Sequence, residues 1–104
     1  MFLKSININN QYVKFKLPFL KEGYLIRWNK LSKTDIHHHN NKQCDFILLN
    51  GELLECIYKK KSINSLDTIR KIDKLKKYSI NDTIGYHQIF NLDKKIKWSI
   101  HNYY

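Results

Sequence analysis

Residues 34–51, TDIHHHNNKQCDFILLNG, combine three consecutive histidines with an alternating apolar segment. Apolar residues at Phe46 and Leu48 predict a strand with one buried face, because side chains alternate along a strand. If His37 and His39 also lie on a strand, their imidazoles point to the same face and can bind one metal ion. A histidine run is also compatible with a solvated surface, so this stretch alone leaves a metal site open.

The segments on either side of this stretch predict further short strands. Residues Tyr24, Ile26 and Trp28 alternate in the same way. The pair Asn50-Gly51 separates two apolar runs, 46–49 and 53–58, and predicts a hairpin with a tight turn at Gly51. Residues 59–74 are polar and rich in lysine, so we expect an extended loop with one helical turn at 66–72. Further strands are expected at 75–80, 85–91 and 96–103, which makes the chain all-β.

Length and composition limit the possible functions. The chain has 104 residues, of which 42% are hydrophobic, enough for one domain over residues 1–104 with a single core. Only two cysteines occur, and we find neither a secretory leader nor an apolar run long enough to cross a bilayer. We therefore expect an intracellular, cytoplasmic protein that does not insert into membranes.

The chain is strongly basic, with a formal net charge of +10. Its lysines are dispersed, and the only run is Lys59 to Lys61, which we interpret as a solvated loop. We expect at most weak, non-specific binding of nucleic acid, because no aromatic stacking motif accompanies the charge.

The spacing of His37, His39, Cys44 and Gly51 resembles the first metal motif of the cupins, with cysteine where most cupins have glutamate. That cysteine makes the chain similar to the animal-type cysteine dioxygenases. Residues 81–91, NDTIGYHQIFN, resemble the second motif of that family through His87 and Asn91. The resemblance implies a single small cupin domain, a double-stranded β-helix or jelly-roll barrel.

Ser99, His101 and Tyr103, on alternate residues of a final strand, resemble the catalytic triad of the same family. The family resemblance implies that Tyr103 orients substrate or oxygen, that His101 hydrogen-bonds the tyrosine hydroxyl and that Ser99 holds His101. It also implies a thioether bond between Cys44 and Tyr103, although a free cysteine is often simply a small buried residue. We expect Cys44 and Tyr103 to face each other across the barrel.

The resemblance implies one Fe²⁺ bound by His37, His39 and His87. Three neutral imidazoles leave a divalent ion its full charge, which favours a thiolate substrate, and they leave coordination positions open. Zinc suits the same ligands but has no redox chemistry. Asp35 and Asp45 are nearby carboxylates, which we interpret as solvated residues at strand edges.

Three departures from the family affect what the resemblance implies. Tyr12 and Lys14 match a tyrosine and arginine that bind the substrate carboxylate, and lysine lacks the two-pronged guanidinium. Arg27 or Lys16 could take over this role. Gln43 replaces a histidine near the metal motif. The sequence also lacks the N-terminal helical region and C-terminal extension of the family's enzymes, so we expect a more open site.

Two functions follow from these observations. The first is an iron-dependent thiol dioxygenase that converts cysteine or a related small thiol to its sulfinic acid with O₂. The second is a non-enzymatic cupin that retains a metal site and binds a partner or nucleic acid.

Overall fold

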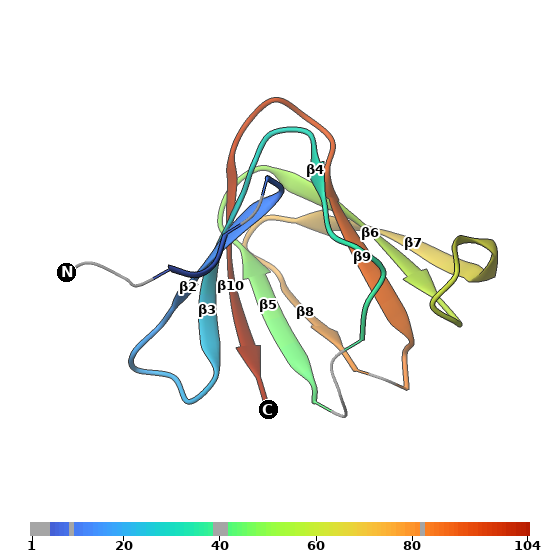
Figure 1. Cartoon of the computed structure of the whole chain (residues 1–104), viewed down its shortest axis with the longest axis horizontal. Helices are drawn as coiled ribbons and strands as arrows, with labels where there is room; N and C mark the ends of the chain where they lie inside the picture. Colours follow the sequence, from blue (N-terminus) through green and yellow to red (C-terminus); the bar gives the residue numbers. More distant parts are fainter. Residues whose placement is uncertain (1–4, 9, 39–41, 82) are drawn as a thin grey trace.

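The protein forms two antiparallel sheets, seen in a computed structural model that describes residues 5–8, 10–38, 42–81 and 83–104 (Figure 1). The larger sheet has the order β1-β2-β3-β10-β5-β8 and the smaller one the order β4-β9-β6-β7. The strands are β1 (Ser5–Ile8), β2 (Tyr12–Lys16), β3 (Gly23–Trp28), β4 (Ser32–Lys33), β5 (Cys44–Leu48), β6 (Glu52–Tyr58), β7 (Leu66–Asp73), β8 (Lys77–Ile80), β9 (Tyr86–Asn91) and β10 (Lys97–Tyr103). This is the all-β, jelly-roll architecture that the sequence predicts.

The core lies between the two sheets. Ile26, Trp28, Phe46 and Leu48 project from the larger sheet and are at most 4% exposed. The facing residues of the smaller sheet include Leu53, Ile57, Ile72 and Ile89. Each such aliphatic or aromatic side chain stabilises the fold by about 1.5–3 kcal/mol when fully buried. The alternation predicted for residues 24–28 and 46–48 is therefore confirmed.

Strand β7 corrects the prediction of a loop and helical turn in residues 59–74. Leu66–Asp73 is an eight-residue strand paired with β6, and the only helical turn described there is the three-residue Ile63–Ser65. The strand lies at the edge of the smaller sheet, and Ile72 is its only buried residue. An edge strand exposed along most of its length lacks the apolar alternation that identifies strands in a sequence.

The turn at Gly51 corrects a second prediction. Gly51 has a φ of +70°, as the predicted turn requires, but β5 and β6 do not form a hairpin. They belong to different sheets, so the chain crosses between layers at this point. A Cβ at Gly51 would lie 2.5 Å from Lys97 Nζ, which adds a steric reason for glycine. The crossing places Cys44 and Glu55 in opposite sheets.

The remaining predicted strands are confirmed with small shifts of their ends. β8, β9 and β10 begin one or two residues after the predicted starts at 75, 85 and 96. In the part of the chain that the structure describes, no helix has the length and apolar character needed to cross a membrane.

Candidate functional site

A cavity of about 380 Å³ opens between the two sheets. It is lined by residues from both sheets, among them Tyr12, Lys14, His37, His87, His101 and Tyr103. These six were all singled out from the sequence. Cys44 and Ser99 lie behind the wall, at 1% and 0% exposure. His39, the remaining expected metal ligand, lies outside the described residues.

His37 and His87 lie side by side although only His87 is on a strand. His37 forms a single antiparallel bridge with His87, in which each backbone amide donates to the other's carbonyl at 3.0 and 2.8 Å. The expectation that His37 belongs to a regular strand is therefore corrected. The bridge still brings the two imidazoles together, with ring centroids 4.4 Å apart.

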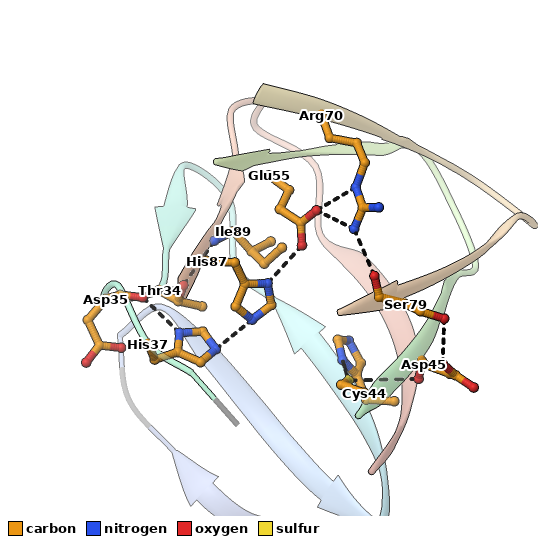
Figure 2. A network of polar contacts seen from close by, with 11 residues as sticks. Thr34, Asp35, His37, Cys44, Asp45, Glu55, Arg70, Ser79, His87 and Ile89 are labelled. Carbon is orange, nitrogen blue, oxygen red and sulfur yellow. Dashed lines mark hydrogen bonds and ion pairs between the residues drawn. The ribbon is translucent and has the colours of Figure 1, made fainter. Parts of the chain in front are cut away.

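The hydrogen bonds of these two imidazoles determine which nitrogens face the cavity (Figure 2). His37 Nδ1 lies 2.9 Å from the carbonyl oxygen of Asp35, and His87 Nδ1 lies 2.8 Å from Glu55 Oε2. A carbonyl and a carboxylate only accept hydrogen bonds, so both Nδ1 atoms must donate. The two Nε2 atoms are 2.9 Å apart, and in neutral rings their lone pairs face each other. Because two facing lone pairs repel, the contact needs either a proton on one of the two nitrogens or a metal ion bound to both.

The pKa of His37 agrees with a metal-binding form. Burial lowers this pKa to about 4, with a further contribution from the neighbouring His87. His37 is therefore neutral at physiological pH, and neutral imidazole is the form that binds metals.

Glu55 is a functional candidate that the sequence analysis missed. Its side chain on β6 is 0% exposed, between the inward-facing Leu53 and Ile57. Oε1 accepts a hydrogen bond from Arg70 Nε at 2.6 Å and lies 2.5 Å from Arg70 Nη2. Oε2 accepts a hydrogen bond from His87 Nδ1. An acidic residue at an inward position of an apolar strand signals a buried partner, and this signal was available in the sequence. We call Arg70, Glu55, His87 and His37 the ionic network.

A second chain of hydrogen bonds links residues of the larger sheet. Trp28 Nε1 donates to Ser99 Oγ at 2.8 Å, and Ser99 Oγ lies 2.7 Å from His101 Nε2. His101 Nδ1 is 3.6 Å from Cys44 Sγ. We call Trp28, Ser99, His101 and Cys44 the neutral network. The Ser99 oxygen accepts the hydrogen bond from the Trp28 indole, so the serine hydroxyl hydrogen is available for donation to His101.

Cys44 and Tyr103 are neighbours on adjacent strands, not residues facing each other across the barrel. They are directly paired in the register of β5 with β10. Burial raises the pKa of Cys44 to about 12, and the hydrogen bond with Tyr103 lowers it only in part. Burial and the adjacent Cys44 also raise the pKa of Tyr103. Both groups therefore stay protonated at neutral pH.

Lys14 supplies a cation to the cavity next to two aromatic rings. Its Nζ lies 4.4 Å from the ring centroid of Tyr24 and 5.5 Å from that of Tyr103. Burial lowers the pKa of Lys14, while Cys44 and Glu22 act in the opposite direction. An ammonium over aromatic faces is held by cation–π attraction and remains able to pair with an anion.

The two alternative cations that the sequence suggested do not lie in the described cavity lining. Arg27 alternates with Ile26 and Trp28 on β3 and so projects to the other face of the sheet, where its Nε is buried without a hydrogen-bond partner. Lys16 Nζ donates to the carbonyls of Leu17 and Leu20. Of the three candidates, Lys14 is the one placed to meet a ligand.

Asp45 projects away from Cys44, as expected, and stays on the surface side of β5. Burial alone would raise its pKa, but hydrogen bonds from Ser79, Tyr104, Gln43 and Lys77 outweigh burial and lower it. Gln43 thus serves the surface cluster around Asp45, with its Nε2 2.9 Å from Asp45 Oδ1.

Asp35 contributes its backbone carbonyl to His37, and Asn91 lies at the far end of β9. The Asn91 side chain donates to the carbonyls of Asn29 and Lys95, which anchors two loops.

The described residues fit a metal ion at His37 and His87 as part of a ligand set. Two nitrogens each roughly 2.1 Å from one ion can be at most about 4.2 Å apart, and the observed separation of 2.9 Å lies within that limit. Among the described residues no group of three or more histidine, cysteine or acidic side chains forms a metal cluster. His39 is the third ligand that the sequence suggests.

Comparisons with known proteins agree with this architecture. The model of the family described as cysteine dioxygenase type I matches residues 10–104. A search of curated protein sequences finds no match to the chain.

Solved structures similar to this one include cupins of several kinds. An oxalate oxidase has a TM-score of 0.64 at 17% identity, over 79% of this chain and 40% of that chain. The CENP-C cupin domain of Drosophila melanogaster has a TM-score of 0.74 at 10% identity, over 98% and 75%. The capsular polysaccharide assembling protein CapF of Staphylococcus aureus has a TM-score of 0.68 at 21% identity, over 99% and 29%. The chain thus spans well under half the length of two of these relatives. At these identities the likeness establishes the cupin fold alone.

Proposed function

The chain belongs to the family of type I cysteine dioxygenases, and on that premise we propose that it is an iron-dependent thiol dioxygenase. The reaction adds both atoms of O₂ to a thiol, R–SH + O₂ → R–SO₂H, with cysteine or a related small thiol as substrate. His37, His39 and His87 are the proposed ligands of Fe²⁺.

The observation that carries this proposal is the pair of Nε2 atoms in the cavity. The Nδ1 atoms of both rings donate to acceptors, so the two Nε2 atoms are the ring nitrogens left to bind a metal, and they lie 2.9 Å apart. A structural zinc site has four protein ligands, whereas a metal ion held by three histidines would keep coordination positions open for substrate. Iron, when bound, supplies the redox chemistry that activates O₂ and lowers the pKa of a coordinating thiol.

The other cavity residues have roles that their positions support. Lys14 would pair with the substrate carboxylate, because its ammonium borders the cavity beside Tyr24 and Tyr103. The Tyr103 hydroxyl, protonated at neutral pH, would donate a hydrogen bond to substrate or oxygen. His101 and Ser99 would hold the strand face that carries Tyr103. Cys44, the register partner of Tyr103, would be the partner in a thioether bond.

The decisive test is oxygen uptake by protein loaded anaerobically with Fe²⁺ and then mixed with air-saturated cysteine, cysteamine or 3-mercaptopropionate. We expect one O₂ consumed per sulfinic acid formed, measured by an oxygen electrode and mass spectrometry. Zinc-loaded protein is the matched control and should consume none, because zinc has no redox chemistry.

Iron retention without oxidation of any thiol would overturn the enzymatic proposal. The alternative from the sequence, a non-enzymatic cupin that binds a partner through its basic surface, would then become the working hypothesis. Retention of the parent mass after turnover, with no loss of two hydrogens, would overturn the thioether bond alone.

A further inference from the structure

Glu55 is a buried carboxylate whose two oxygens have different partners. Oε1 pairs with Arg70, at 2.6 Å from Nε and 2.5 Å from Nη2. Oε2 accepts a hydrogen bond from His87 Nδ1 at 2.8 Å. The carboxylate is 0% exposed. A charge taken out of water is tolerated only when it is paired and hydrogen-bonded. Arg70 supplies the charge pairing on Oε1, and His87 Nδ1–H supplies the hydrogen bond on Oε2.

From this arrangement we propose that Glu55, held by Arg70, is the residue that positions His87 for metal binding. The inference rests on the proposed function, because it assumes that His87 is a ligand. By accepting the hydrogen bond from Nδ1, Glu55 favours the tautomer with the lone pair on His87 Nε2, the atom that lies 2.9 Å from His37 Nε2 (Figure 2). A carboxylate in this position also increases the basicity of the imidazole towards a metal.

Because Arg70 contacts Oε1 of Glu55, the second carboxylate oxygen, Oε2, is the one that positions His87. Arg70 comes from β7, its side chain is 30% exposed, and its Nη2 also reaches the carbonyl of Ser79 on β8 at 3.4 Å. Arginine only donates hydrogen bonds, and His87 Nδ1–H donates as well. The side chain at position 55 must therefore accept hydrogen bonds from two donors at once, and only a carboxylate has an acceptor oxygen for each.

His37 is positioned differently, which makes it an internal reference. Its Nδ1 donates to the backbone carbonyl of Asp35, an acceptor that no substitution at Glu55 removes. A change at Glu55 should alter the tautomer of His87 and leave that of His37 unchanged.

The substitution Glu55→Gln tests the proposal, because glutamine has one acceptor oxygen for two donors. If that oxygen serves Arg70, the amide NH₂ faces His87 Nδ1, which must then accept. His87 would change to the Nε2–H tautomer and direct a proton into the cavity. We expect Fe²⁺ affinity, measured anaerobically by competition with a chromophoric chelator, to fall about 10–100-fold.

Two-dimensional ¹H–¹⁵N correlation spectra of the imidazoles give a readout that needs neither metal nor turnover. In the chelator-treated wild type we expect His87 as the Nδ1–H tautomer, and in Glu55→Gln a shift towards Nε2–H. Glu52→Gln is the matched control, since Glu52 lies on the same strand with 61% of its side chain exposed. It should change neither the tautomer nor the affinity.

The double variant Glu55→Gln/Arg70→Ala separates positioning from a purely structural ion pair. Removing Arg70 frees the glutamine oxygen for His87, so the Nδ1–H tautomer and part of the Fe²⁺ affinity should return. A structural role predicts the opposite, because the double variant then loses every contact of the pair.

The inference is wrong if wild-type His87 is the Nε2–H tautomer, a result that requires no variant to fold. It is also wrong if Glu55→Gln matches Glu52→Gln in both readouts. Failure of the proposed function is distinguishable, because inactive protein that still shows the expected tautomers and Fe²⁺ affinities would remove the dioxygenase assignment and leave the positioning role intact.

Discussion

The two walls of the cavity hold their histidines by different means. In the ionic network, a buried carboxylate and a backbone carbonyl accept the Nδ1 protons of His87 and His37, so both Nε2 atoms face the cavity. In the neutral network, Ser99 occupies Nε2 of His101, and Cys44 lies beside its Nδ1. All three imidazoles border the same cavity, but only those of the ionic network present a nitrogen suited to a metal.

The contrast shows that proximity to a cavity does not define a ligand. A histidine becomes a metal ligand when the other ring nitrogen has a hydrogen-bond acceptor, because that acceptor fixes which nitrogen carries the proton. The ionic network therefore suits metal binding. The neutral network suits hydrogen bonding and the retention of protons on Cys44 and Tyr103.

The largest expected difference between the two walls is in iron content. His87→Ala should reduce bound iron at least tenfold, because it removes a nitrogen already directed at the cavity. His101→Ala removes an imidazole of the same cavity and should leave iron content close to that of the wild type while slowing turnover. Elemental analysis after anaerobic loading measures both. Equal loss of iron in the two variants would refute the distinction between the networks.

The second prediction concerns stability. Arg70→Ala leaves Glu55, which is 0% exposed, without its cation, and removing one partner of a buried pair costs about 3–5 kcal/mol of unfolding free energy. Trp28→Phe removes one neutral hydrogen bond to Ser99 and should cost about 1–2 kcal/mol. Urea denaturation of metal-free protein gives both values.

Lys71→Ala is the control for the loss of a surface cation from β7. The Lys71 side chain is 63% exposed, so solvent screens its ion pairs, and Lys71→Ala should lower stability far less than Arg70→Ala does. A loss in Arg70→Ala no larger than in Lys71→Ala would show that Glu55 does not depend on its partner.

The larger part of the fold could be predicted because alternating apolar residues identify buried strands. The positions of Ile26, Trp28, Phe46 and Leu48 illustrate this, since each lies in the core as its parity requires. The turn at Gly51 was predicted for the right residue and the wrong topology. An Asn-Gly pair sets a local backbone direction, and nothing in the pair specifies whether the next strand joins the same sheet or the opposite one.

The ionic network could be predicted only in part, for a related reason. Arg70 belongs to β7, whose exposed edge hides the alternation of a strand, so the residue was assigned to a loop. The inward position of Glu55 indicates that it has a buried partner, but without a strand at 66–73 nothing identified Arg70 as that partner. The histidines were visible in the sequence because their spacing is local. The groups that orient them come from separate strands, and the pairing of those strands is a property of the folded chain.

The third prediction separates the networks by pH. Burial raises the pKa of Cys44 from 9.0 to about 12, so the unfolded chain loses this proton at lower pH than the native protein does. The contribution of this pKa shift to the free energy of unfolding is complete below pH 9 and is lost as pH rises towards 12. The free energy of unfolding falls by roughly 1.4 kcal/mol per pH unit at most. Cys44→Ala should therefore show a shallower loss of stability between pH 9 and 11 in urea denaturation. Parallel curves for the two proteins would mean that the thiol ionises as readily in the native state as in the unfolded chain.

The smallest expected effect is on substrate choice, at the lysine that borders the cavity beside Tyr24 and Tyr103. Lys14 offers a single point charge, so Lys14→Arg should lower the Michaelis constant for cysteine severalfold and Lys14→Ala should raise it. Cysteamine has no carboxylate and should be nearly indifferent to both changes. Lys16→Ala is the matched control, because Lys16 follows on the same face of β2 but its ammonium donates to the carbonyls of Leu17 and Leu20. Steady-state kinetics on the two thiols at matched iron content measure the difference. If Lys14→Ala affects cysteine and cysteamine alike, its contact with Tyr24 and Tyr103 supports the cavity wall, and the carboxylate is held by another group.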